Sequence, residues 1–510
     1  MPKQSAFTAL FPVRDENVVP LRRLLNAVGQ NITTEREVLM EKVEEFLSPD
    51  PTRPKGRCFL EFHKLTTVHF LRWVLLEAAT DAEGRRIGAT LAFATDYDGP
   101  LDAHVDELIG VAGAALEAIF SFCDPAPATG ALKPYLLAAQ RPYAAFYRGH
   151  PGRSVQQIWG ASNHSEEELR RVLKNELDRP PYPVTAEDTV TRARWSAGHS
   201  GWRSASTAGE PQKKPQVSSK LLWLFAGAIL VFGILSPSWV VGCAVASVVA
   251  LVLLLILFIG LWGTALNLLD RRDRTRERQL LNQQGLPPDT DGSKDPYVSD
   301  RSRKRLMIVT DLENRRGLIQ NQMTHVVNIK PGWIRLVTLR FVLWAVNLLG
   351  SLVFVEGKLG NIPTIHFARW VLIDDNRRLL FFSNYDFSWE SYLGDFIDLA
   401  SVGLTGIWCN TTFFPQTRIP AWTIIPRALK LVLPVQSQTG NQSAKRLFEQ
   451  GARREQEFKK WTRDHQVPTQ VWYSAYPSLS VVNVNNNTEI ARGLFTSHTG
   501  AALGTWLRKL

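Results

Sequence analysis

Cysteine is scarce and scattered in this chain of 510 residues. The four cysteines are Cys58, Cys123, Cys243 and Cys409, and no two of them form a CxxC pair. Disulfide-stapled domains and structural zinc sites are built from paired cysteines, so the spacing argues against both and suits a reducing compartment.

Local catalytic signatures are also missing. The sequence has no GxGxxG, Walker A, HExxH or GxSxG motif, which lowers the case for nucleotide-dependent enzymes, zinc peptidases and serine hydrolases. Whether the chain is an enzyme stays open at this point.

The charge balance is basic, with a formal net charge of +11, while 45% of residues are hydrophobic. At this length two or three globular domains are expected. The excess cations gather around one apolar stretch, where anionic lipid headgroups are a better partner than nucleic acid. These cations are Lys213, Lys214, Lys220, Arg271, Arg272, Arg274, Arg276 and Arg278.

The apolar stretch, Leu221–Leu269, contains no charged residue. One helix of that length would measure about 74 Å, against a hydrocarbon core of roughly 30 Å. Two spans, near 220–237 and 240–263, are therefore expected around the break at Ser236-Pro237-Ser238. Basic residues on both outer flanks predict an integral membrane protein with both soluble halves cytoplasmic. The alternative is a buried hydrophobic hairpin.

A second apolar run, Phe341–Val355, has only 15 residues, with Arg335 and Arg340 just upstream. That length indicates a core helix or an interfacial helix rather than a third span.

The chain repeats one phrase. Thr67–Leu75 (TVHFLRWVL) returns as Thr364–Leu372 (TIHFARWVL), with seven of nine residues identical. The similarity continues from 91–98 to 379–386, and from 146–155 to 472–481. This indicates a duplicated soluble unit with a membrane anchor between the copies.

Each copy contains four runs rich in β-branched and aromatic residues, which predict strands. Long helical patterns are expected at about 17–47 and 333–356, and another helix follows the third strand of each copy. The order β-α-β-β-α-β is that of a ferredoxin-like unit, so the fold class is α+β. The predicted strands cover 7–13, 66–76, 87–96 and 143–149 in the first copy, and 323–329, 363–373, 377–385 and 470–476 in the second.

The composition divides the chain into five parts. They are ferredoxin-like repeat 1 (1–179), a basic Pro/Ser/Gly linker (180–218), a transmembrane hairpin (219–269), a charged helix with a flexible linker (270–319), and ferredoxin-like repeat 2 (320–510).

At the level of fold, two such units in one chain resemble the dimeric α+β-barrel group, which includes dye-decolourising peroxidases and chlorite dismutases. The resemblance covers strand order and duplication, not a motif. It implies two sheets packed face to face around a pocket, and it makes haem a candidate cofactor. Fold alone does not give function.

The repeated phrase supplies the first candidate site. Because alternate strand residues share a face, His69 should lie beside Trp73, and His366 beside Trp370. Such a face could line a barrel and bind an aromatic ligand, haem or an oxyanion. The alternative is a half-buried strand whose histidine is hydrogen-bonded and whose arginine is paired.

The second candidate site is the turn after the next strand, with Asp98 in one copy and Tyr385-Asp386 in the other. Asp98-Gly99 is similar to the end of the Gly-x-x-Asp-Gly motif of dye-decolourising peroxidases, but Thr95 replaces its first glycine. The alternative is an aspartate that caps a helix. We therefore take Asp98, Arg369 and Asp386 as catalytic candidates, and His69, Trp73, His366, Trp370 and Tyr385 as ligand-binding candidates.

The haem families also imply a proximal histidine in the second unit, for which His366, His465 and His498 are candidates. Two functions follow. One is a membrane-anchored, cytoplasm-facing tandem module that binds a small apolar or lipid-like ligand or a partner protein. The other is a haem-dependent peroxidase-like oxidoreductase at the inner membrane face. A homo-oligomer is compatible with both.

Overall fold

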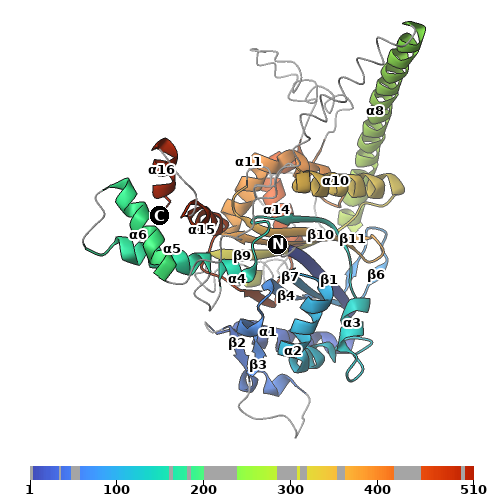
Figure 1. The fold of residues 1–510 in the computed structure, drawn as a ribbon. Coiled ribbons are helices and arrows are strands. Elements are labelled where there is room, and N and C mark those ends of the chain that lie inside the picture. The colour runs from blue at the N-terminus through green and yellow to red at the C-terminus, as the bar shows by residue number, and fades with distance from the viewer. Residues whose placement is uncertain are drawn as a thin grey trace.

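The computed structural model confirms a mixed α+β fold (Figure 1). It describes residues 4–33, 36–47, 58–159, 165–180, 185–199, 238–283, 307–309, 319–352, 362–417, 450–494 and 500–509. The strands predicted in the two copies are all present, with boundaries that differ from the predicted ones by a few residues.

Two four-stranded antiparallel sheets form the centre of the molecule. The first sheet has the order β1 (Gln4–Pro12), β7 (Thr90–Asp98), β4 (Val68–Leu76) and β12 (Val471–Ser474). The second has the order β8 (Tyr143–Arg148), β10 (Ile365–Ile373), β11 (Arg378–Asp386) and β9 (Gln320–Asn328).

The last strand of each half belongs to the sheet of the other half. β8 pairs with β10 through Ala368–Tyr147, and β12 pairs with β4 through Tyr473–Leu71. Each sheet therefore takes three strands from one copy and its fourth, edge strand from the other. The two halves of the chain are joined by backbone hydrogen bonds as well as by side-chain packing.

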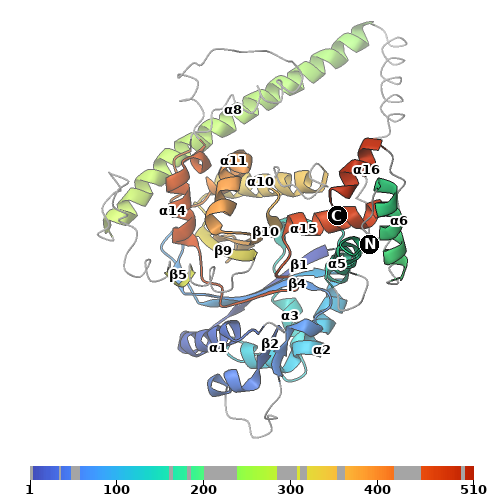
Figure 2. The same cartoon turned by 90° about the vertical axis from the view of Figure 1, so that its left-hand side faces the viewer.

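The sheets pack face to face through a layer of apolar side chains. Val74 and Ala94 of the first sheet and Val371 and Phe382 of the second belong to this layer, and all are buried. Helices cover both outer faces, so the body has four layers (Figure 2). The helices are α1 (Val18–Gln30), α2 (Leu101–Phe120) and α3 (Leu132–Ala138) on the first sheet, and α10 (Trp333–Leu352), α11 (Trp389–Trp408) and α14 (Glu455–His465) on the second.

The long helix predicted at 17–47 is wrong over its second part. Asn31 ends α1 by returning its side-chain amide to the Ala27 carbonyl, and the chain then forms β2 (Glu37–Leu39), two short 3-10 turns and β3 (Cys58–Glu61). Two further strands, β5 (Ala79–Thr80) and β6 (Arg86–Ile87), make a small hairpin.

The helices that follow the exchanged strands form a separate apolar cluster, in which Leu169 and Leu173 pack against Ile490 and Trp506. The cluster combines elements of both halves, and α6 lies within the segment whose composition favours a linker. Its helices are α5 (Glu166–Leu177), α6 (Ala186–His199), α15 (Val481–Leu494) and α16 (Gly500–Leu507), with the short α4 (Val155–Ile158) just before them.

One 46-residue helix, α8 (Ser238–Gln283), rises from the body (Figure 1). It joins the predicted second span and the predicted charged helix without a break. It is the one helix among the described residues that is long and apolar enough to span a bilayer, over Ala246–Gln279, and only 6% of its apolar window is buried. The predicted first span, 220–237, lies outside the described residues.

The C-terminal part of α8 is fixed to the body by buried ion pairs. Asp270 lies 3.0 Å from Lys330 Nζ, and Asp273 lies 2.8 Å from Arg335 Nη2. Both cationic side chains are buried. Removing one partner of such a pair leaves a buried, unpaired charge, which costs about 3–5 kcal/mol. The helix is therefore held firmly at its base.

Two glycines lie where the exchanged strands meet the opposite half. A Cβ on Gly29 of α1 would lie 1.9 Å from the Gln470 carbonyl oxygen, and one on Gly149 would lie 1.9 Å from the Ile365 carbonyl oxygen. Both carbonyl oxygens are backbone atoms, so neither can relieve the clash by a side-chain rotation. Glycine permits this close approach at both contacts.

We predict that Gly29→Ala and Gly149→Ala each lower the free energy of unfolding, since the exchanged strands must shift. Gly110→Ala is the matched control, because Gly110 also lies in a helix but meets nothing within 4 Å. Alanine should stabilise that position by up to about 1 kcal/mol. Urea unfolding of the three variants tests this, and destabilisation by Gly110→Ala comparable with that by Gly29→Ala would contradict it.

Candidate functional site

The repeated phrase does not form the His-Trp face that strand alternation predicts. A register shift between Val68 and Phe70, matched by one between Ile365 and Phe367, interrupts the alternation at each histidine. The tryptophans pack on the outer, helix-covered faces, with Trp73 stacked on Phe93 and Trp370 beside Phe381. The bulges allow the histidines to turn instead toward the seam between the halves.

In the first half, the His69 ring is held by groups from two segments. Its Nε2 lies 3.0 Å from Asp98 Oδ1, and its Nδ1 lies 2.8 Å from the hydroxyl of Tyr476, which follows the exchanged strand β12. The second oxygen of Asp98 accepts from the backbone N–H of Val155, at 2.8 Å, at the start of α4. Asp98 therefore binds the first amide of a helix that is distant in sequence and that Ser154 caps, while α2, the helix that follows Asp98, has no side-chain cap.

The second half repeats this geometry. His366 Nε2 lies 2.8 Å from Asp386 Oδ1, whose other oxygen accepts from the N–H of Val481, the first residue of α15. His366 Nδ1 lies 3.3 Å from His150 Nε2, and His150 follows the exchanged strand β8. His150 and Tyr476 are thus equivalent residues of the two copies, and each serves the histidine of the other copy.

The two half-sites join into one chain of hydrogen bonds, because Tyr476 Oη also lies 3.2 Å from His150 Nε2. The orientation of the Gln4 amide is consistent with one proton arrangement of this chain. Gln4 Nε2 faces His150 Nδ1 at 3.4 Å while its Oε1 accepts from Gly152, so His150 carries its proton on Nε2. The Tyr476 hydroxyl then donates to His69, whose other nitrogen donates to Asp98. The histidine ring nitrogens of this chain are therefore all engaged within the protein.

Between the sheets lie two arginines, Arg72 and Arg369, each 1% exposed. Arg72 donates to the carbonyls of Met323 and Ser383, and Arg369 donates to those of Phe7 and Thr95. The same two acceptor positions of the duplicated unit, Phe7/Met323 and Thr95/Ser383, are therefore used in both directions. Each guanidinium enters the opposite sheet, and both lie over the Phe382 ring, at 4.9 and 5.4 Å.

Two polar residues complete this seam. Asn384 Nδ2 donates to Asp96 Oδ2 at 3.0 Å, Arg72 donates to Asn384 Oδ1, and Arg369 lies 3.7 Å from Asp96. Burial lowers the pKa of Arg72 to about 9, with repulsion from Arg369 adding to the effect. Burial also raises the pKa of Asp96, against the attraction of the two arginines. One carboxylate thus faces two guanidiniums in a dry layer.

The haem interpretation finds no matching site in these residues. His69 and His366 are fully buried, and both ring nitrogens of each are hydrogen-bonded. His465 turns its Nδ1 to the Trp461 carbonyl at 2.8 Å, and His498 lies outside the described residues. In the described part of the chain, no three His, Cys, Asp or Glu side chains are placed to hold a metal ion.

His150, Tyr476, Asp96 and Asn384 are not among the site residues predicted from the sequence, although the repeat carries a signal for each of them. His150 and Tyr476 occupy equivalent positions of the two copies, 326 residues apart, and Asp96 and Asn384 do so at a spacing of 288. Tyr385, a ligand-binding candidate, is buried against Tyr392 with ring centroids 3.8 Å apart. It lies in the core of the second half.

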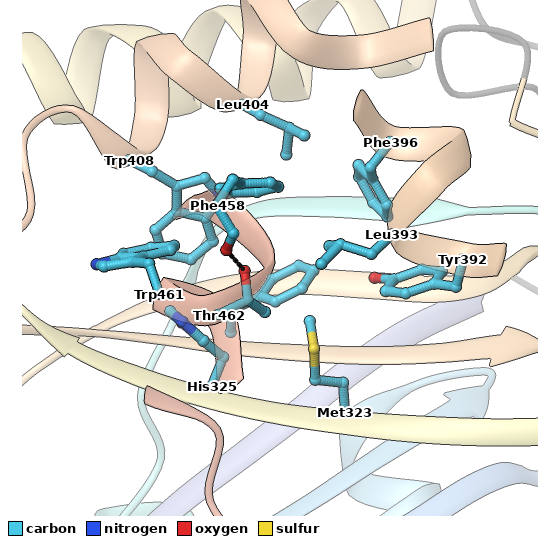
Figure 3. A pocket seen from close by; sticks show the side chains of 11 residues that line it. Met323, His325, Tyr392, Leu393, Phe396, Leu404, Trp408, Phe458, Trp461 and Thr462 are labelled. Carbon is cyan, nitrogen blue, oxygen red and sulfur yellow. Dashed lines mark hydrogen bonds between the residues drawn. The ribbon is translucent and has the colours of Figure 1, made fainter. Parts of the chain in front are cut away.

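A small cavity lies on the outer face of the second sheet, beneath α11 and α14 (Figure 3). Its volume is about 20 Å³, which is room for about one water molecule. Aromatic and aliphatic side chains dominate the lining. The lining residues are Met323, His325, Phe381, Tyr392, Leu393, Phe396, Leu404, Trp408, Phe458, Trp461 and Thr462.

No family model matches this chain, and neither the curated proteins nor the solved structures contain a significant match to it.

We predict that Tyr476→Phe destabilises the protein by about 1–3 kcal/mol, because buried nitrogens of His69 and His150 lose a partner. Tyr135→Phe is the control, since the Tyr135 hydroxyl reaches the Pro125 carbonyl near the surface. Its loss should change stability by no more than about 0.5 kcal/mol. Urea unfolding measures both, and equal effects would contradict the role assigned to Tyr476.

A second prediction concerns His104, whose pKa burial lowers to about 3. Because an unfolded histidine titrates near pH 6.5, the unfolded state binds the proton first as pH falls, and stability is lost below about pH 6.5. The equivalent residue of the second copy is Tyr392, which bonds Ser383 as His104 bonds Thr95.

His104→Tyr should therefore keep the ring stacking and the hydrogen bond while removing the titration. From pH 7.0 to 5.5 the wild type should lose about 1.3 kcal/mol more unfolding free energy than the variant. Urea titrations at the two pH values measure this difference. Parallel pH profiles for the two proteins would refute the prediction.

Proposed function

We propose that this protein is a membrane-anchored, cytoplasm-facing binding module built from two ferredoxin-like units that exchange their last strands. The observation that carries the proposal is α8. Its apolar residues from Val248 to Leu261 are largely exposed, while its charged end is locked into the body by Asp270 and Asp273. A soluble protein rarely leaves so large an apolar surface uncovered.

The dimensions of α8 support a membrane span. The stretch from Ser238 to Leu261 would measure about 36 Å as a helix, enough to cross a hydrocarbon core of roughly 30 Å. The exposed arginines Arg271, Arg272, Arg276 and Arg278 follow the apolar stretch. Such a basic flank favours the cytoplasmic side. The two-span hairpin with both halves cytoplasmic, predicted from the basic flanks, remains part of this proposal.

The polar clusters of the body support a binding role over catalysis. The His69–Tyr476–His150 chain and the Arg72–Asn384–Asp96 seam are buried, and their main contacts are with one another and with backbone groups. The ring nitrogens of the histidine chain are hydrogen-bonded, whereas Asp96 Oδ1 of the seam has no hydrogen-bond partner among the described residues. Buried polar networks help to specify a unique core. The haem-dependent alternative would need a ligand nitrogen facing a wide pocket, and these histidines are otherwise engaged.

Within the module, the aromatic cavity of Figure 3 is the place where a small apolar or lipid-like ligand would bind. Its lining is mostly apolar, with Tyr392, His325 and Thr462 as polar groups, which is the usual composition of a ligand pocket. At about 20 Å³ the cavity must widen to admit such a ligand. The mostly apolar lining favours an apolar ligand over a partner protein as the occupant.

The anchor is tested by membrane fractionation of the full chain. The wild type should stay in the membrane fraction after an alkaline carbonate wash, and Leu254→Arg/Leu257→Arg should not. Each arginine near mid-membrane costs about 2.5–3.5 kcal/mol. Val19→Arg/Val482→Arg, at exposed positions of the body, is the matched control. Release of the wild type by the carbonate wash would contradict the proposed membrane anchor.

Ligand binding is tested with a fluorescent fatty-acid analogue and the detergent-purified chain. Leu404→Trp fills the cavity and should weaken binding about tenfold, or ~1.4 kcal/mol. Leu399→Trp lies on the same helix but points outward, where Leu399 is 47% exposed, and should bind like the wild type. Equal binding by both variants, or none by the wild type, would remove the cavity from the proposal.

A further inference from the structure

Helix α10 is apolar on its buried face and on its exposed face. Arg335, Leu339 and Leu343 point into the body and are at most 1% exposed. The opposite face is also apolar, although a surface helix normally turns polar residues outward. Five large side chains, at spacings of four, four, three and four residues, form this outer stripe. They are Trp333 (68% exposed), Val337 (46%), Phe341 (62%), Trp344 (56%) and Leu348 (38%).

The stripe adjoins the exposed apolar part of α8. Trp262 of α8 contacts Trp333 edge to face, with ring centroids 5.8 Å apart, and its Nε1 donates to Thr338 Oγ1 at 2.9 Å. Figure 1 shows α10 beside the lower part of α8. The apolar surface of α8 therefore continues onto α10 at a pair of tryptophans, the residue type most enriched at membrane–water interfaces.

The two helices are held in fixed relation by the buried ion pairs below this junction. Lys330 lies just before α10 and Arg335 lies in its first turn, and both contact α8 carboxylates. Arg335 Nη2 also lies 3.6 Å from Asp270, so one guanidinium bridges two acids. A membrane that holds α8 must therefore meet the body on the side that carries α10.

We propose that the outer stripe of α10 lies in the interfacial layer of the same bilayer that α8 enters, as a second membrane contact. This inference rests on the proposed membrane anchor and adds the orientation of the body. The apolar side chains would enter the boundary between headgroups and acyl chains, as in other amphipathic interfacial helices. The exposed Arg271, Arg272 and Arg340 lie near anionic headgroups in this arrangement.

A lipid surface explains the stripe better than a second protein copy does. The stripe is continuous with α8, whose apolar part is long enough to span a bilayer. Along α8 the apolar residues are followed by the tryptophan junction and then by arginines, which is the order expected from the membrane core to the cytoplasmic side. Burial of the stripe in lipid would hide five large side chains at once.

Spin labels on the full chain in nanodiscs of phosphatidylcholine and phosphatidylglycerol test the proposal. Cys58 and Cys243, the partly exposed and exposed cysteines, are first replaced by alanine. Single labels are then placed at Val337→Cys on the stripe, at Leu253→Cys on α8, and at Val19→Cys on α1 as an exposed control. Collision rates with oxygen, which dissolves in lipid, and with an aqueous nickel chelate are compared.

The expected result is that labels at 337 and 253 collide more with oxygen than with nickel, and that the label at 19 does the reverse. A label at 337 that behaves like the label at 19, with 253 in lipid, overturns the interfacial helix and leaves the anchor standing. A label at 253 exposed to nickel overturns both. A label at 337 shielded from both agents overturns the proposal in favour of a covering protein.

Discussion

The exchange of the last strands is the constraint on which the rest of this structure depends. Because β8 completes the second sheet and β12 the first, neither half has all four strands of its sheet without the other. The exchange brings His150 to His366 and Tyr476 to His69, and it holds the sheets face to face over a shared apolar layer. The duplicated sequence thus encodes one interlocked body rather than two independent units.

The buried polar groups follow from this pairing. Equivalent residues of the two copies meet near the seam, so one sequence pattern satisfies both sides: Arg72 and Arg369 each reach backbone carbonyls of the opposite sheet. The copies have diverged where they meet. His150 faces Tyr476, and Asp96 faces Asn384, so one donates where the other accepts. Two identical aspartates at 3.0 Å would repel each other or require a shared proton.

Much of the fold could be predicted from local patterns, but its pairing could not. Runs rich in β-branched and aromatic residues located the strands, and the duplicated phrase gave the two copies. The sheet that β8 joins is not encoded in β8 alone, because an edge strand has the same period on either sheet. A strict alternation pattern does not predict the bulges at His69 and His366. Because of these bulges, the tryptophan and the histidine of each copy do not share a face: the tryptophan lies in the core and the histidine is hydrogen-bonded.

The exchange itself can be measured by cross-linking. Tyr147 of β8 lies opposite Ala368 of β10, and facing residues of antiparallel strands have the spacing that a disulfide needs. Tyr147→Cys/Ala368→Cys, combined with a protease site inserted within residues 286–292, should give one band on a non-reducing gel after cleavage and two after reduction. Two bands before reduction, in folded protein, would contradict the account.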